Sequence, residues 1–247
     1  MEESKRIKKR IWIMVSLKGL YHCPSSQYSW AKDLGFNLIE VRAESLNFML
    51  PKIQEAINSL HALRMSAMID LYSAYDLNTT HEYLKELELE DSDIIYLMDE
   101  PNLKNLPPAY IRGLHDAAKS IKPRNRTMIV LSWIRPYEIG GNTYVNCADI
   151  IGLDFYKKYW NDPWGALKLM WRSKRLRRHH LGPIVGVPAI RYSASFVKQQ
   201  AWFWKCIIKV DGLCFYSGTP CEEKPPWGSK YLWEMLDTCK ILKEINE

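Results

Sequence analysis

The sequence lacks a hydrophobic run long enough to cross a membrane. The longest apolar run near the start, Ile11–Leu17, is far shorter than the roughly 20 residues that a membrane-spanning helix needs. The basic run Lys5–Arg10 precedes it, but the apolar run is too short for a signal-peptide core and no small-residue cleavage site follows. We therefore expect a cytoplasmic protein with no membrane partner, in which residues 1–10 form a basic segment and residues 11–247 one domain.

Nucleotide, metal and nucleophile motifs are also absent. The chain contains no GxGxxG or GxxxxGK[ST] glycine loop and no GxSxG nucleophile elbow. Its six cysteines form no CxxC pair and show no zinc-binding spacing with histidines. We therefore expect neither a metal nor an organic cofactor, and reduced thiols, as is usual in a cytoplasm.

Aromatic residues are plentiful, whereas excess charge is small. The 34 Lys and Arg residues against 28 Asp and Glu give a net charge of +6, too little to imply a nucleic-acid partner. An apolar fraction of 47% excludes a disordered chain. The 10 Trp and 14 Tyr residues exceed what a core needs, and such rings are typical of sugar-binding or interface surfaces.

Short apolar runs alternate with amphipathic stretches along the whole chain. The runs predict eight parallel strands, at 11–17, 37–42, 65–72, 94–99, 127–133, 149–154, 183–189 and 212–217. Helical patterns cover 46–63, a segment from Thr79-Thr80, 107–121, 164–180, a segment from Ser193, and 228–245. Only a short helix fits within 138–147. The spacing predicts an α/β protein, a single (β/α)8 TIM barrel; an open doubly wound sheet would normally carry a glycine loop.

In such a barrel the active site forms where the strands end. Acids and rings gather at these strand ends, and this electronegative mouth favours a neutral carbohydrate as the partner. The candidates are Ser16, Glu40, Arg42, Glu44, Asp70, Tyr72, Asp99, Glu100, Ser132, Trp133, Asp154, Tyr156, Pro188, Arg191, Tyr216 and Ser217.

The fourth strand ends in two adjacent carboxylates, Asp99 and Glu100, followed by Pro101. Side chains alternate along a strand, so the two acids start on opposite faces, and Pro101 lets Glu100 turn over the mouth. Two like charges raise one pKa and supply the protonated acid that glycoside hydrolysis needs. The simpler interpretation is that the tripeptide only caps a strand and begins a loop.

These motifs together resemble the glycoside-hydrolase-like TIM barrels around clan A. Glu100-Pro101 matches the acid glutamate that follows strand four in that clan, with Asp99 where asparagine is usual, and the Asp99-Glu100 pair is similar to that of β-N-acetylhexosaminidases. Residues 148–156 and 212–217 resemble strands six and eight of such hydrolases. The resemblance implies a glycosidase with Glu100 as general acid, Asp99 as its partner or a substrate-orienting group, and Asp154 as a second carboxylate.

The same resemblance suggests substrate-binding roles for further residues. Tyr156, Trp133 and Tyr216 would stack on sugar rings, although core packing is the alternative for each. Arg42 would orient a catalytic carboxylate or form an inner-barrel salt bridge. The remaining candidates for substrate contact are Asp70, Tyr72, Glu40 and Trp227, of which Trp227 is in a segment with loop-like composition.

One departure from the clan leaves the mechanism open. The clan has its nucleophilic glutamate at the end of strand seven, but residues 183–191 contain no acid. Three hypotheses therefore remain: an inverting pair of Glu100 with Asp154 or Asp70, substrate assistance with Asp99 as helper, or an inactive barrel that binds carbohydrate or an assembly partner.

A basic stretch offers a further partner. Residues 171–180 carry Arg172, Lys174, Arg175, Arg177 and Arg178 beside a tryptophan, and such a cluster could bind phosphates. A solvated helix whose cations complement the helix dipole is the simpler interpretation, so a nucleic-acid partner is only a weak alternative.

Overall fold

The computed structural model describes residues 17–21, 23–43, 49–72, 76–132, 138–139, 142–155, 162–188, 194–216 and 236–246. Eight parallel strands close into a barrel in the order β1-β10-β9-β8-β5-β4-β3-β2. The strands are β1 (Leu17–Tyr21), β2 (Leu38–Arg42), β3 (Ser66–Asp70), β4 (Ile94–Asp99), β5 (Arg126–Ser132), β8 (Ile150–Asp154), β9 (Ile184–Val187) and β10 (Gly212–Tyr216). The predicted α/β fold, a single (β/α)8 barrel, is confirmed.

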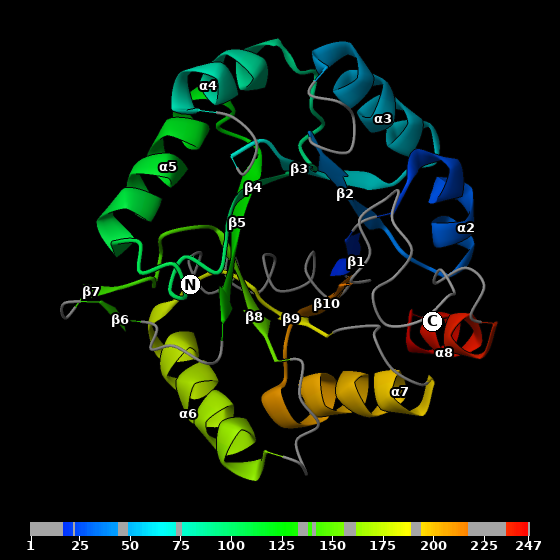
Figure 1. Cartoon of the computed structure of the whole chain (residues 1–247), viewed down its shortest axis with the longest axis vertical. Helices are drawn as coiled ribbons and strands as arrows, with labels where there is room; N and C mark the ends of the chain where they lie inside the picture. The colour runs from blue at the N-terminus through cyan, green and yellow to red at the C-terminus, as the bar shows by residue number, and fades with distance from the viewer. Residues whose placement is uncertain are drawn as a thin grey trace, which may run out of the picture.

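Helices surround the strands in a ring (Figure 1). They are α2 (Tyr28–Asp33), α3 (Leu50–Ala62), α4 (Leu77–Glu86), α5 (Pro108–Ile121), α6 (Pro163–His179), α7 (Ala194–Trp202) and α8 (Leu236–Asn246), with a short 3-10 helix η1 (Ser25–Gln27) before α2 and a π-helix η3 (Phe203–Ile208) after α7. Within the described ranges, no helix combines the length and the hydropathy that a membrane span requires.

The first predicted strand is wrong. The barrel uses Leu17–Tyr21 as its first strand, whereas the prediction was 11–17, of which residues 11–16 lie outside the described part. Gly19 lets Leu17–Tyr21 pack against β10, because a Cβ at this position would lie 2.7 Å from the Cys214 sulfur across the β1–β10 pair. Only glycine fits where these two strands pack. The other seven predicted strands each overlap a barrel strand.

Several helix predictions also need correction. Asp76, not Thr79 or Thr80, caps α4, since its side chain accepts from the N–H groups of Asn78 and Thr79. In the described part of 138–147 the chain forms a two-stranded hairpin, β6 (Glu138–Ile139) with β7 (Asn142–Thr143), instead of a short helix. The sequence pattern also missed α2, a six-residue helix too short to show a helical period.

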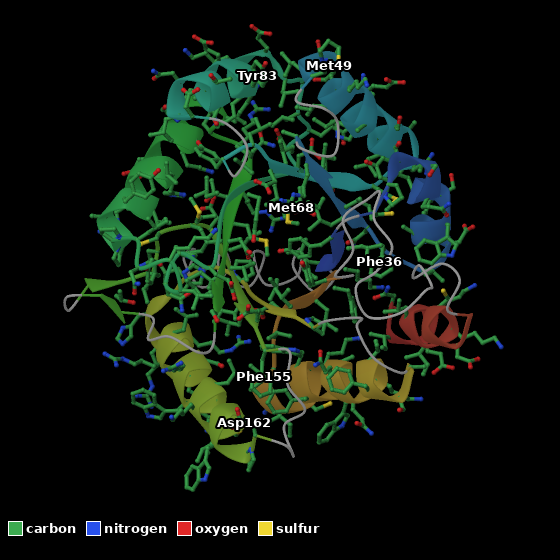
Figure 2. The ribbon with its side chains drawn as sticks, viewed as in Figure 1. Phe36, Met49, Met68, Tyr83, Phe155 and Asp162 are labelled. Atoms are coloured by element: carbon green, nitrogen blue, oxygen red, sulfur yellow. The ribbon has the colours of Figure 1, made fainter. Side chains whose placement is uncertain are left out.

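The barrel has two apolar cores, one on each side of its sheet. Side chains inside the ring of strands, such as Met68 in Figure 2, form the inner core with Leu38, Met128 and Val185. The outer core fills the layer between strands and helices, where Phe155 contacts Phe203. Gly186 points into this outer layer and leaves room for Trp204 of η3, which is fully buried.

A short polar residue precedes four of the strands and closes the opposite, amino-terminal end of the barrel. Asn37 accepts from Lys18 N–H at 2.9 Å, Asp93 from Ala67 at 2.7 Å, Asp149 from Thr127 at 3.0 Å and Asp211 from Ile184 at 2.9 Å. Each acceptor lies just before a strand and caps an N–H at the start of the neighbouring strand. The second, fourth, sixth and eighth barrel strands therefore share one capping device, and Asp149 of the resemblance motif serves the fold.

Candidate functional site

The carboxyl ends of the strands bring together a set of polar side chains that we call the mouth residues. They are Tyr21 of β1, Glu40 of β2, Asp70 of β3, Tyr96 and Asp99 of β4, Asp154 of β8 and Tyr216 of β10. Side chains alternate along a strand, so a mouth residue shares its face with the residue two positions earlier. Each mouth residue lies on the inner face, next to an inner-core residue of its own strand or of the paired strand. Predicted site residues from five strands therefore share one end of the barrel.

A β-bulge in β4 decides which acid faces the interior. Tyr96 pairs with Met128 but Met98 pairs with Ile129, so one extra residue interrupts the register. Leu97 and Met98 both pack on the outer core, and the next residue, Asp99, returns to the inner face. The phenolic O–H of Tyr96 donates to Asp99 Oδ1 at 3.0 Å, which fixes that carboxyl over the inner core.

The surroundings of Asp99 raise its pKa. Its side chain keeps exposed surface, yet the surrounding protein desolvates the carboxylate and, together with the charges of Glu100 and Asp70, raises the pKa of Asp99. The Tyr96 hydrogen bond and Lys104 oppose this shift without cancelling it. Burial, followed by the charges of Asp99, Tyr21, Asp70 and Glu40, raises the pKa of Tyr96 well above its usual value, so Tyr96 stays a hydrogen-bond donor.

Glu100 adopts an unusual backbone conformation directly after the strand. Its φ of 48° lies in the left-handed region, which costs a non-glycine residue about 1 kcal/mol or more. The turn that holds it is tightly bonded: its N–H donates to Val130 O at 2.9 Å, and its carbonyl accepts from Leu103 and Lys104 at 3.0 and 3.1 Å. The side chain is half-buried and makes no hydrogen bond or ion pair to described residues.

Asn102 anchors this turn to the neighbouring strand. Its side-chain amide donates to Ser132 O at 2.6 Å, and its carbonyl oxygen accepts from Ser132 N–H at 2.9 Å. Both residues are buried. This two-way bond fixes the loop after β4 against the end of β5, so it sets the position of the Asp99–Glu100 pair.

The acids of β2 and β3 have a cation beside them. Arg42 Nε lies 3.7 Å from Asp70 Oδ2, in the inner-barrel salt bridge that was one of the two interpretations of Arg42. Glu40 is buried and, with Asp70, contributes to the raised pKa of Tyr96. The charge of Asp70 is one of the causes that raise the pKa of Asp99.

Asp154 is the interior residue at the end of β8. It is only 2% exposed and pairs in register with Ser132 on one side and Val187 on the other. Asp154 lies on the same face of β8 as Gly152, two residues earlier. That face is the interior one, because a Cβ on Gly152 would meet Val130 and Val187 inside the barrel. The last interior side chain of β9 is thus the valine Val187, not an acid.

The aromatic candidates divide into three groups. Tyr216 is a mouth residue, and its ring meets that of Tyr21 edge-on with centroids 6.3 Å apart. Tyr72 belongs instead to the outer core, where its ring contacts His81 of α4 and burial raises its pKa to about 12. Trp133, Tyr156 and Trp227 lie outside the described residues.

Sequence reasoning missed Tyr21 and Tyr96 as site residues. Tyr21 was overlooked because the predicted first strand ends at Leu17, four residues before the observed end, so Ser16 was the candidate there. Tyr96 was overlooked because the alternation pattern puts Asp99 on the opposite face, and only the bulge brings the two together. Within the described ranges, no cluster of three or more His, Cys, Asp or Glu side chains is arranged to hold a metal ion.

Comparison with known proteins gives structural likeness only. No model of a protein family matches the chain, and no curated protein matches it in sequence. Among solved structures it is similar to a β-glucuronidase from Ruminococcus gnavus in complex with D-glucaro 1,5-lactone, at 10% identity and a TM-score of 0.62. That match covers 95% of this chain and 50% of the other, so this chain spans half the length of that enzyme.

Two further solved structures extend the likeness. A β-1,4-mannanase of family GH113 matches at 9% identity and a TM-score of 0.62, covering 93% of this chain and 97% of the mannanase. The β-glucuronidase 2 of Bacteroides uniformis, bound covalently to a cyclophellitol-6-carboxylate aziridine, matches at 12% identity and a TM-score of 0.57, covering 89% and 33%. With its closed eight-stranded parallel barrel, this chain has the fold of a glycoside-hydrolase-like TIM barrel.

Proposed function

We propose that this chain hydrolyses O-glycosidic bonds, with the Asp99–Glu100 pair as its acid. The observation that carries the proposal is the geometry of Asp99, whose carboxyl accepts from Tyr96 at the barrel mouth and adjoins Glu100. Burial and the neighbouring acids raise its pKa, and a carboxyl with a raised pKa holds its proton to a higher pH, which suits the group that protonates the departing sugar oxygen. The fold supports the same reaction class.

Within the pair we assign proton delivery to Asp99, whose pKa is raised by its burial and by the neighbouring Glu100. The proton moves from the pair to the glycosidic oxygen as the bond from that oxygen to the anomeric carbon breaks. The sequence suggested the reverse division, with Glu100 as the acid. Either carboxyl can take its proton from water, so the response of each variant to the leaving group decides between the two assignments.

The second carboxylate in the proposal is Asp154. An inverting reaction needs a base that removes a proton from water as the water oxygen attacks the anomeric carbon. Asp154 is a buried interior acid at the end of another strand of the barrel. Inversion at the anomeric carbon supports this pairing, and retention supports substrate assistance with Asp99 as the helper.

One observation favours a second function, binding of carbohydrate or an assembly partner without catalysis. β9 ends inside the barrel in Val187, so the strand that holds the nucleophile in clan A presents an apolar side chain here. A barrel of this kind keeps the aromatic and acidic mouth but catalyses no reaction.

Hydrolysis of aryl glycosides separates the two functions. We expect the purified full chain to release nitrophenol from at least one nitrophenyl glycoside in a panel of neutral, N-acetylated and uronic sugars. Asp99→Asn should lower the rate by about 10²–10⁴-fold, because general-acid catalysis contributes that much. The loss should be much smaller with dinitrophenyl glycosides, whose leaving group needs no proton.

The control is Asp33→Asn, an exposed aspartate on α2, which should leave the rate unchanged. Glu100→Gln tests the division of labour: a loss that also depends on the leaving group assigns proton delivery to Glu100. Wild-type protein that binds sugars without hydrolysing any glycoside contradicts the proposal and supports the binding function.

A further inference from the structure

Exposed apolar side chains concentrate on one side of the barrel, at α6 and its neighbours. Six of the nine exposed large apolar side chains in the described ranges lie on α6, the turn after it, and the α7–η3 segment. They are Trp164, Leu167, Trp171, Leu181, Trp202 and Ile207. Helix α6 is part of the helix ring, next to α7 (Figure 1). Solvent-facing indoles and leucines grouped in this way mark an interaction surface.

Helical geometry aligns the exposed residues of α6 in one stripe. With 3.6 residues per turn, Trp164, Trp171 and Arg178 follow one another along the outermost line of the helix, opposite the buried Leu169 and Leu176. Trp164 is 73% exposed, Trp171 62% and Leu167 53%. Nothing in the packing of the barrel requires these side chains, because the buried face of α6 already supplies its core contacts.

The sequence of α6 and of the turn after it is basic. From residue 163 to residue 181 the chain has six cations and no carboxylate; the cations are Lys168, Arg172, Lys174, Arg175, Arg177 and Arg178. Figure 2 shows Asp162 at the start of α6, where it caps the helix by accepting from Gly165 N–H. Arg177 bonds to Asp211 and the Lys209 carbonyl, so it serves the fold. Lys168, Lys174 and Arg178 are exposed and make this face of α6 basic.

We propose that the exposed face of α6 docks this protein onto an anionic lipid surface. Tryptophan is the side chain that favours the membrane interface, and leucine gains free energy by insertion below the headgroups. Lysine and arginine on the flanks attract the negative headgroups and can extend toward them from the apolar stripe. The surface is the outside of a helix and is convex, so it can lie along a bilayer.

The same chemistry fits a nucleic acid less well. Arg175 lies over the Trp171 ring at 5.7 Å from its centroid, so one face of the indole is already covered and is lost to base stacking. Leu167 and Leu181 gain nothing from a phosphate backbone, whereas both are buried when the face meets lipid.

Vesicle sedimentation tests the proposal with the full chain. We expect the protein to sediment with vesicles of equal parts phosphatidylcholine and phosphatidylserine, to stay in solution with pure phosphatidylcholine, and to dissociate as salt rises. Lys174→Glu with Arg178→Glu, and separately Trp164→Ser with Trp171→Ser, should each weaken binding by about tenfold or more. All four residues are exposed, so the variants keep the fold, which circular dichroism verifies.

The matched control is Lys52→Glu with Lys85→Glu, which makes the same charge change on exposed residues of α3 and α4. This variant should bind vesicles as the wild type does. Absence of binding to the anionic vesicles at low salt overturns the proposal, as does equal loss in the control variant. Tighter binding to single-stranded or duplex DNA than to vesicles, lost in the α6 variants, also overturns it and assigns the face to nucleic acid.

Discussion

At the scale of single residues, the site depends on how one extra residue in β4 directs its side chains. Without the bulge, alternation would keep Asp99 on the face opposite Tyr96; with it, the Tyr96 hydroxyl reaches the Asp99 carboxyl. The electrostatic consequence is the raised pKa of Asp99, which depends on burial, Glu100 and Asp70 together.

Asn102 positions this pair without touching a reacting group. Asn102→Ala removes two bonds to the buried Ser132 backbone, so we expect the free energy of unfolding to fall by about 2–3 kcal/mol. If the chain is a glycosidase, kcat should fall more than KM rises, because the turn holding Asp99 and Glu100 loosens. Denaturant unfolding and steady-state kinetics measure the two effects.

The control for this substitution is Asn58→Ala on α3, where the asparagine is exposed and bonds only to Gln54. It should change stability by less than about 0.5 kcal/mol. An Asn102→Ala protein as stable as the Asn58→Ala protein contradicts the anchoring role.

At the scale of elements, the four polar caps before β2, β4, β8 and β10 hold the amino-terminal end of the barrel. Asp93 is the most heavily bonded: it is fully buried and accepts from Ala67, Glu90 and the His61 ring. We expect Asp93→Ala to lower the free energy of unfolding by about 3–5 kcal/mol, because these donors lose their partner inside the protein.

Asp91→Ala provides the comparison for Asp93, two residues away. Asp91 is exposed and forms only a surface ion pair with Arg124 at 3.7 Å, so its loss should cost less than about 1 kcal/mol. Equal effects of the two substitutions in urea unfolding would show that the cap contributes nothing.

Gly186 tests how η3 packs on β9, and Gly113 of α5 is the comparison. A Cβ at Gly186 would lie 2.6 Å from the Trp204 ring, so Gly186→Ala should destabilise the protein by about 1–3 kcal/mol. Gly113 lies exposed in α5 with nothing within 4 Å of its Cβ position, and Gly113→Ala should stabilise by about 0.5–1 kcal/mol. Thermal unfolding that moves both variants in the same direction contradicts this packing.

The elements differ in how far the sequence predicted them. Seven strands were predictable because strands covered on both faces are nearly continuous apolar runs, as in β3 and β8. β1 was not, since Lys18 and Gly19 break its apolar pattern and its place depends on packing against Cys214. The hairpin β6–β7 replaced an expected helix because two-residue strands have no period to detect.

The candidate site was predictable in part, for the same physical reason. The strand-end rule finds Glu40, Asp70, Asp154 and Tyr216, since strand boundaries follow from hydropathy. It does not find the bulge, the left-handed Glu100 or the outward Tyr72, because these depend on backbone register and packing across strands. Trp133, Tyr156 and Trp227 stay predictions, since they lie outside the described residues.

At the scale of the whole molecule, a raised aspartate pKa makes stability depend on pH. The folded chain binds the Asp99 proton more tightly than the unfolded chain, so ionisation of Asp99 costs folding stability. The cost is absent below the ordinary aspartate pKa of 3.8 and grows as pH rises through the raised value. We expect Asp99→Asn to stabilise the protein at neutral pH and to change little below that ordinary value.

Melting temperatures of the wild type and Asp99→Asn across this pH range measure the effect, with Asp33→Asn as the exposed control. If Asp99→Asn raises the melting temperature equally at both ends of the pH range, or lowers it at neutral pH, ionisation of Asp99 costs no folding stability. Such a result removes the protonated acid and the proposed reaction with it.

The most direct test of the account is the titration of Asp99 itself, by carbon-13 NMR of aspartate carboxyl groups. We predict that the Asp99 carboxyl, identified by its absence in Asp99→Asn, has a midpoint above the ordinary value of 3.8 that shifts down in Glu100→Gln, where the neighbouring charge is gone. A carboxyl of Asp99 that titrates at or below 3.8, or whose midpoint ignores Glu100→Gln, contradicts the account.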